Sequence, residues 1–144
     1  MLQLIYASAA TVDFSEEDLR KLLQVARRNN AKDGVTGMLV YQDGAFLQIL
    51  EGDPAAVQRV YDKIEKDPRH NNVKLLLRTE IEERSFGEWQ MGFFNATGNR
   101  LYGVPGFCNF FRSSHPFGDD DIDRARSVLL KFKEGAWRQK ATAN

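Results

Sequence analysis

Three polar side chains interrupt stretches of sequence that otherwise have the apolar pattern of a protein core. Tyr6 lies in the apolar run 2–8, and Gln48 lies in the run 46–50, which is otherwise apolar. Asn30 continues a helical apolar stripe one turn beyond Ala26, so its amide should point at a sheet. An unpaired buried amide or hydroxyl costs about 1–3 kcal/mol, so such groups need partners. A phenol and two amides that converge would line a slot for a flat heterocycle carrying both donors and acceptors.

Each of these three residues also has an ordinary explanation. A strand tyrosine such as Tyr6 commonly belongs to the core with its hydroxyl at the rim, and Gln48 could bond to backbone. Asn30 could be a helix C-cap. Their expected convergence between the first helix and the central strands favours the slot, but the residues alone specify no ligand.

Periodicity and turn residues indicate the elements that must position these groups. Ser15 and the acidic residues after it begin a helix that Gly34 ends. A second helix begins at Asp53-Pro54 and ends at Asp67-Pro68. Its apolar stripe, expected to be core, is Val57, Val60, Tyr61 and Ile64. Strands are predicted at 2–8, 35–41, 45–51 and 73–81, with a fifth at 90–95 and a turn at Asp43-Gly44.

This order, β-α-β-β-α-β with an extra strand, predicts an α+β fold of the ferredoxin-like type. We expect the first and third strands to lie side by side and parallel in the middle of the sheet, with both helices over one face. Residues 1–95 form the predicted domain, and 96–144 form a helical extension. A helix at 120–134 could cap the uncovered face of the sheet or form a contact between copies.

Composition excludes several classes of protein. The 144 residues carry 20 basic and 20 acidic side chains, so the chain lacks the positive surplus of a nonspecific nucleic-acid binder. One cysteine excludes an internal disulfide, and no His/Cys cluster suggests a metal. Neither a signal peptide nor a membrane span is apparent, so we expect a soluble cytoplasmic protein.

Five short motifs, in order and in register over residues 1–95, make the chain resemble a BLUF domain, a sensor of blue light using flavin adenine dinucleotide (FAD). The motifs are Leu4-Ile-Tyr6-Ala-Ser8, Asn29-Asn30-Ala-Lys-Asp-Gly34-Val-Thr-Gly37-Met-Leu, Phe46-Leu-Gln48-Ile-Leu-Glu51-Gly52, Asp67-Pro-Arg-His70 and Arg84-Ser-Phe86-Gly-Glu-Trp89-Gln-Met91-Gly.

The resemblance implies a role for each of the three polar residues. Asn30 matches the asparagine that bonds the pyrimidine edge of the flavin, and Gln48 matches the glutamine between the flavin and a tyrosine. Tyr6 matches that tyrosine, from which light drives an electron and a proton to the flavin. The Gln48 amide then rearranges, by rotation or tautomerisation, and the absorption spectrum shifts to the red.

The resemblance extends to residues around the ring. Asp67, Arg69 and His70 match positions that contact the ring edge and the ribityl chain, and Asn29 matches a flavin-lining position. His70 could instead be an ordinary surface residue. Trp89 and Met91 match the pair that carries the signal outward, although both could be core filler.

By resemblance, the chain is a stand-alone photoreceptor and not an enzyme, with FAD as cofactor and FMN or riboflavin as substitutes. Its signal would pass to a separate effector protein or to another copy in a homodimer or higher oligomer, without direct nucleic-acid or membrane contact. The alternative is a ferredoxin-like small-ligand-binding or hydrolase domain without light sensing. Against a hydrolase, the loop after the first strand (residues 9–13) has no arginine to hold a phosphoryl group.

Overall fold

The computed structural model describes residues 1–42, 44–84, 92–95, 100–101, 128, 131–132 and 134–135. In these, the chain runs through β1 (Leu2–Ala10), α1 (Glu16–Asp33), β2 (Thr36–Gln42), β3 (Ala45–Gly52), α2 (Pro54–Glu65), β4 (His70–Glu80), β5 (Gly92–Asn95) and β6 (Arg100–Leu101). The α+β, ferredoxin-like prediction is confirmed.

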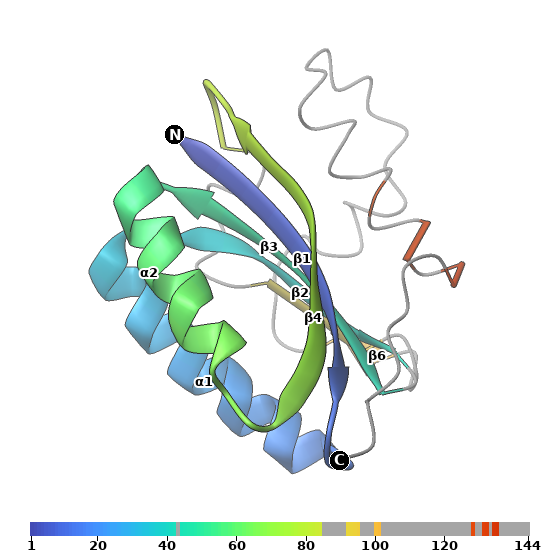
Figure 1. Ribbon diagram of the computed structural model, residues 1–144. Coiled ribbons are helices and arrows are strands. Elements are labelled where there is room, and N and C mark those ends of the chain that lie inside the picture. Colours follow the sequence, from blue (N-terminus) through green and yellow to red (C-terminus); the bar gives the residue numbers. More distant parts are fainter. Residues whose placement is uncertain are drawn as a thin grey trace.

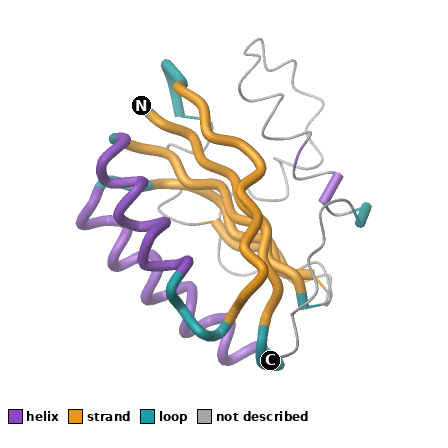
Figure 2. Tube along the Cα trace, viewed as in Figure 1, coloured by secondary structure: helices purple, strands orange, loops and turns teal. Residues whose placement is uncertain are grey.

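The strands form one twisted sheet in the order β4-β1-β3-β2-β5-β6. Figures 1 and 2 show α1 and α2 together on one face of this sheet, as the sequence predicts. β5 pairs parallel to β2, which extends the sheet beyond the four strands of the basic fold. No helix within the described residues is long and apolar enough to cross a membrane.

The prediction that the first and third strands run parallel is wrong. β1 and β3 are central neighbours as expected, but they pair antiparallel. The reason is the connectivity: the α1 crossover makes β2 run in the same direction as β1, and the tight turn into β3 reverses the chain. A strand inserted between β1 and β2 must therefore oppose both.

The helix boundaries follow the predicted capping residues. Ser15 accepts a hydrogen bond from the Asp18 amide at 3.1 Å, and the Asp18 carboxylate accepts one from the Ser15 amide, which completes a capping box. Gly34 ends α1 in the left-handed conformation with φ 67°. Asp53 caps α2 through the Ala56 amide. The start of β4 differs: it begins at residue 70 rather than 73, because β1 continues to pair with it past a register shift.

Both faces of the sheet are buried at its centre. Leu4, Tyr6 and Leu50 belong to the core cluster under the helices. Side chains alternate along a strand, so Leu47 and Ile49 face the opposite side, and both are 0% exposed. On that side Figure 1 places the short segment containing Phe132, which is also fully buried. The rest of the helix expected at 120–134 lies largely outside the described residues, so the division at residue 95 stays a prediction.

The close approach of β2 and β3 depends on Gly37. A Cβ added there would lie 1.8 Å from the Ile49 carbonyl oxygen, so the strands would have to separate. Gly34 differs from Gly37. Its φ of 67° would be strained for any other residue type at this position, but a Cβ added there meets none of the described atoms within 4 Å.

We expect Gly37→Ala to lower the free energy of unfolding by about 3 kcal/mol or more, or to prevent folding, because the clash is with backbone. Gly34→Ala, the matched control, should cost only about 1–2 kcal/mol, which is the strain of the left-handed conformation. Urea unfolding followed by circular dichroism measures both. Equal losses for the two variants would contradict the assignment of a close approach to Gly37.

Candidate functional site

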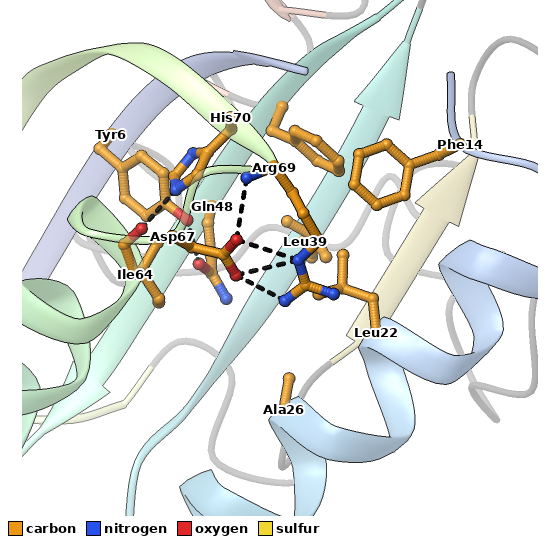
Figure 3. Close-up of a pocket in the computed structure, with 11 residues that line it drawn as sticks. Tyr6, Phe14, Leu22, Ala26, Leu39, Gln48, Ile64, Asp67, Arg69 and His70 are labelled. Atoms are coloured by element: carbon orange, nitrogen blue, oxygen red, sulfur yellow. Dashed lines mark hydrogen bonds and ion pairs between the residues drawn. The ribbon is translucent and has the colours of Figure 1, made fainter. Parts of the chain in front are cut away.

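A pocket opens between the two helices and the helix-facing side of β1 and β3, and Figure 3 shows its lining. Most of its walls are apolar, and its polar groups gather at one end. We call it the inner pocket, and it is lined by Tyr6, Phe14, Leu22, Ala26, Leu39, Phe46, Gln48, Ile64, Asp67, Arg69 and His70.

A second pocket continues from the first between α1 and α2. Six residues line both pockets, among them Gln48 and Ala26. This outer pocket adds Asn29, Asn30 and Lys63, so it is the more polar of the two. Leu22 and Ala26 on the α1 stripe are only half-buried, because they form the pocket wall rather than solid core.

Tyr6 and Gln48 meet directly, because they are partners in the β1–β3 register. Both side chains point to the helix side, and each is 3% exposed. The Tyr6 hydroxyl donates a hydrogen bond to Oε1 of Gln48. This pairing gives each buried polar group a partner and brings the phenol and the amide together at the end of the inner pocket (Figure 3).

The environment of Tyr6 keeps its hydroxyl protonated. Burial raises the pKa of Tyr6 well above its ordinary value, and the nearby Tyr61 and the Asp67 carboxylate add to the shift. The Tyr6 ring also lies 6.4 Å from the His70 ring, tilted by 54°. A phenolate is therefore strongly disfavoured here, so the proton cannot leave this phenol before an electron does.

Asn30 is 3% exposed, and its side-chain Nδ2 has no hydrogen-bond partner within the part of the chain that the structure describes. It is not the C-cap, since Gly34 holds that position, although the Asn30 carbonyl does accept from Val35. The side chain lines the outer pocket beside Gln48. A buried donor without a partner costs about 1–3 kcal/mol, so this atom is suited to a ligand acceptor such as a ring carbonyl.

Asp67 and Arg69 form an ion pair at the edge of both pockets. The Asp67 carboxylate accepts hydrogen bonds from Nε of Arg69 at 3.0 Å and from Nη2 at 2.5 Å, which Figure 3 marks with dashed lines. These bonds hold the pKa of Asp67 below its usual value and raise that of Arg69. Asp67 is half-buried and Arg69 exposed, so the pair lies at the pocket mouth.

His70 lies against the inner pocket with both ring nitrogens already bonded within the protein. Nε2 donates to the carbonyl of Ile64 at the end of α2 (Figure 3), and Nδ1 lies 2.8 Å from Oγ of Ser8 on β1. His70 is therefore no simple surface residue. It ties β1 to α2 and offers the pocket its ring surface.

The other predicted site residues separate into two groups. Asn29 is exposed and lines only the outer pocket. Trp89 and Met91 lie outside the described residues, so their role stays a prediction. Within the described part of the chain, no group of three or more His, Cys, Asp or Glu could hold a metal ion.

Two residues that hold the site together escaped the sequence analysis. Ser8 bonds His70, and its place two residues after Tyr6 on the same strand face was the available signal. Tyr61 was assigned to the core by its helical stripe, but its ring stacks on Tyr6. Stripe position predicts burial and cannot show which buried neighbour a residue contacts.

Comparison with known proteins identifies the domain. A family model described as "Sensors of blue-light using FAD" matches residues 1–92. The chain is 40% identical over 89 residues to photoactivated adenylate cyclase subunit beta of Euglena longa, which covers 61% of this chain and 10% of that protein. It is 35% identical over 92 residues to the blue light- and temperature-regulated antirepressor BluF of Escherichia coli, covering 64% and 23%.

Solved structures agree over a larger part of the chain. BlsA in its photo-activated state has a TM-score of 0.65 at 31% identity, covering 96% of this chain and 98% of that one. Klebsiella pneumoniae BlrP1 has a TM-score of 0.75 at 30% identity, covering 94% and 34%. The chain thus spans only about a tenth of the cyclase relatives and about a third of BlrP1. The match to the family model over nearly two thirds of its length shows that the chain belongs to the BLUF family of blue-light sensors.

Proposed function

We propose that the chain is a blue-light photoreceptor that binds FAD in the continuous inner and outer pockets. The observation that carries this proposal is Nδ2 of Asn30, which has no partner among the described residues and lies beside the bonded Tyr6–Gln48 pair. Apolar walls suit a flat ring system, and Asn30 offers a donor to the polar edge of that ring. These features fit a flavin better than they fit a solid core.

When bound, the flavin absorbs blue light and becomes an electron acceptor. Tyr6 releases an electron first, because burial disfavours the phenolate, and the hydroxyl proton follows because the positive ring is itself costly in a buried site. The Gln48 amide, which carries both a donor and an acceptor, would accept this proton at Oε1 and give up one from its nitrogen to the flavin that has taken the electron. When the electron and proton return to Tyr6, the rotated or tautomerised amide retains a different set of hydrogen bonds.

We propose FAD as the flavin because the matching family model describes sensors that use FAD. With a ring system in the inner pocket, the outer pocket would be left for the rest of the cofactor. The outer pocket is lined by two cations, Lys63 and Arg69, and by two carboxylates, Asp33 and Asp67, so its charge does not distinguish a nucleotide from riboflavin. FMN is the substitute to test, since a solved structure of K. pneumoniae BlrP1 contains it.

The output of the sensor is a changed contact with another protein. Relatives named as adenylate cyclase subunits and as an antirepressor show that BLUF domains occur with different kinds of output. We propose that this chain acts as a cytoplasmic, non-enzymatic sensor on a separate effector or on a second copy of itself.

The purified protein should be yellow, and blue light should shift its flavin absorption reversibly to the red. Absorption spectra before illumination, during it and after dark recovery measure this. A colourless protein that takes up no added FAD, FMN or riboflavin would refute the proposal at its first step.

Tyr6→Phe should keep the flavin and lose the red shift, because the ring shape stays while the redox-active hydroxyl is removed. Flavin content after purification and the light-minus-dark spectrum give the two readouts. Gln48→Leu is the companion variant, since it removes the partner and leaves the phenol. A Tyr6→Phe protein with a normal photocycle would show that Tyr6 is not the electron donor.

Asn30→Leu should weaken flavin binding by about 10- to 100-fold, the value of one buried hydrogen bond. The same change should leave the ligand-free protein equally stable or more so, because it removes a buried donor without a partner. Flavin titration and urea unfolding of the ligand-free protein test the two parts. Asn29→Leu, at the exposed neighbouring position, should weaken binding less; a larger effect there would overturn the assignment.

The amplitude of the red shift should stay constant from about pH 6 to about pH 11 in the folded protein, because the raised pKa keeps Tyr6 protonated beyond its ordinary value of 10.0. The same shift predicts that stability falls above that value, where the unfolded chain loses a proton that the folded chain holds. Light-minus-dark spectra across this range measure the amplitude. A fall with a midpoint at about pH 10 would show that Tyr6 titrates normally.

A further inference from the structure

The Tyr61 ring of α2 stacks nearly parallel to the Tyr6 ring, in an offset arrangement. The ring centroids are 5.5 Å apart and the planes differ by 6°. Tyr61 is 7% exposed and does not line either pocket, so it lies one residue behind the pocket wall. A molecule bound in the pockets would not touch it, yet it covers one face of the residue on which the proposed photochemistry depends.

The orientation of Tyr61 is held from its far end. Its side chain hydrogen-bonds the Glu65 carboxylate, one helical turn further along α2. Val57 and Val60 on the same helix belong to the core cluster, so the α2 backbone at this point is packed against the sheet. The ring of Tyr61 is therefore fixed in its plane by a hydrogen bond and by packing.

We propose that Tyr61 is a positioning residue for the photochemistry, which stabilises the electron-deficient Tyr6 ring by sharing its positive charge across the stack. This inference rests on the proposed function, in which Tyr6 is the electron donor. When Tyr6 loses an electron its ring becomes positive. The face of an aromatic ring attracts a positive charge, most strongly where water is excluded.

The electrons balance within the proposed photoreaction. One electron leaves the Tyr6 ring for the light-excited flavin, and the Tyr6 hydroxyl proton moves toward Oε1 of Gln48 along the existing hydrogen bond. Tyr61 loses no proton and gains no bond. The electron-rich face of the Tyr61 ring stabilises the Tyr6 ring while Tyr6 is positively charged. When the electron returns to Tyr6, both rings are again in their starting state.

The test is the rate of electron transfer from Tyr6, measured as the decay of the flavin excited state by picosecond transient absorption. Tyr61→Leu removes the ring and should slow this step by roughly tenfold, the effect of losing one desolvated charge–ring interaction. Tyr61→Phe keeps the ring and should stay within about threefold of the unmodified protein. If Tyr61→Leu does not fold, Tyr61→Met gives the same comparison with a flexible side chain of similar size.

Tyr41→Leu is the matched control. Tyr41 is also a buried tyrosine one residue behind the pocket, but its ring contacts Phe14 and Phe46 instead of Tyr6. This variant should leave the electron-transfer rate within about threefold of the unmodified protein. Equal slowing by Tyr41→Leu and Tyr61→Leu would show a general loss of packing and overturn the proposal.

A second readout separates charge sharing from a structural effect. In a Tyr6→Phe background the flavin lifetime should be the same with or without the additional Tyr61→Leu change, because the donor is already absent. A lifetime that changes there would show that Tyr61 acts on the flavin without Tyr6, which overturns the inference. Failure of the proposed function is distinguishable, since it would appear as normal quenching in Tyr6→Phe alone.

Discussion

The hydrogen bond from Tyr6 to Gln48 depends on the antiparallel register of β1 and β3, and the rest of the site is arranged around it. The two residues are direct partners across the central pair of strands, so their side chains emerge side by side on the helix-facing side. A register slip of one residue would turn one of them to the opposite face of the sheet. On the other side of β3, Gly37 allows β2 to approach the Ile49 backbone closely.

Around this bond, the polar groups differ in how completely they are satisfied. His70 is bonded through both ring nitrogens, and Asp67 is held by Arg69. Asn30, in contrast, keeps a buried donor that no described residue satisfies. Natural cores rarely leave such an atom unpaired, because its desolvation destabilises the fold. The cost is explained if binding a ligand restores the missing bond.

Local signals in the sequence predicted much of this fold. Ser15, Gly34 and Asp53 each act within a few residues, so their capping roles could be inferred without the tertiary structure. The start of β4 could not be predicted in this way, because Asn71 and Asn72 are residue types that usually indicate a turn. The strand accommodates them through a register shift, with Asn72 at φ 51°. The direction of β3 was open to deduction from the connectivity, whereas the stack of Tyr61 on Tyr6 depends on how α2 packs against β1.

The position of Gln48 on a central strand determines where a change in its hydrogen bonds can travel. Its chain neighbours Leu47 and Ile49 point to the opposite face and are fully buried there. Because β3 is bonded to β1 on one side and β2 on the other, Gln48 is held in the middle of the sheet. On the helix-facing side, His70 and Asp67 are held by their own bonds. The backbone at Gln48 therefore joins the pocket on one face of the sheet to the buried side chains of Leu47 and Ile49 on the other.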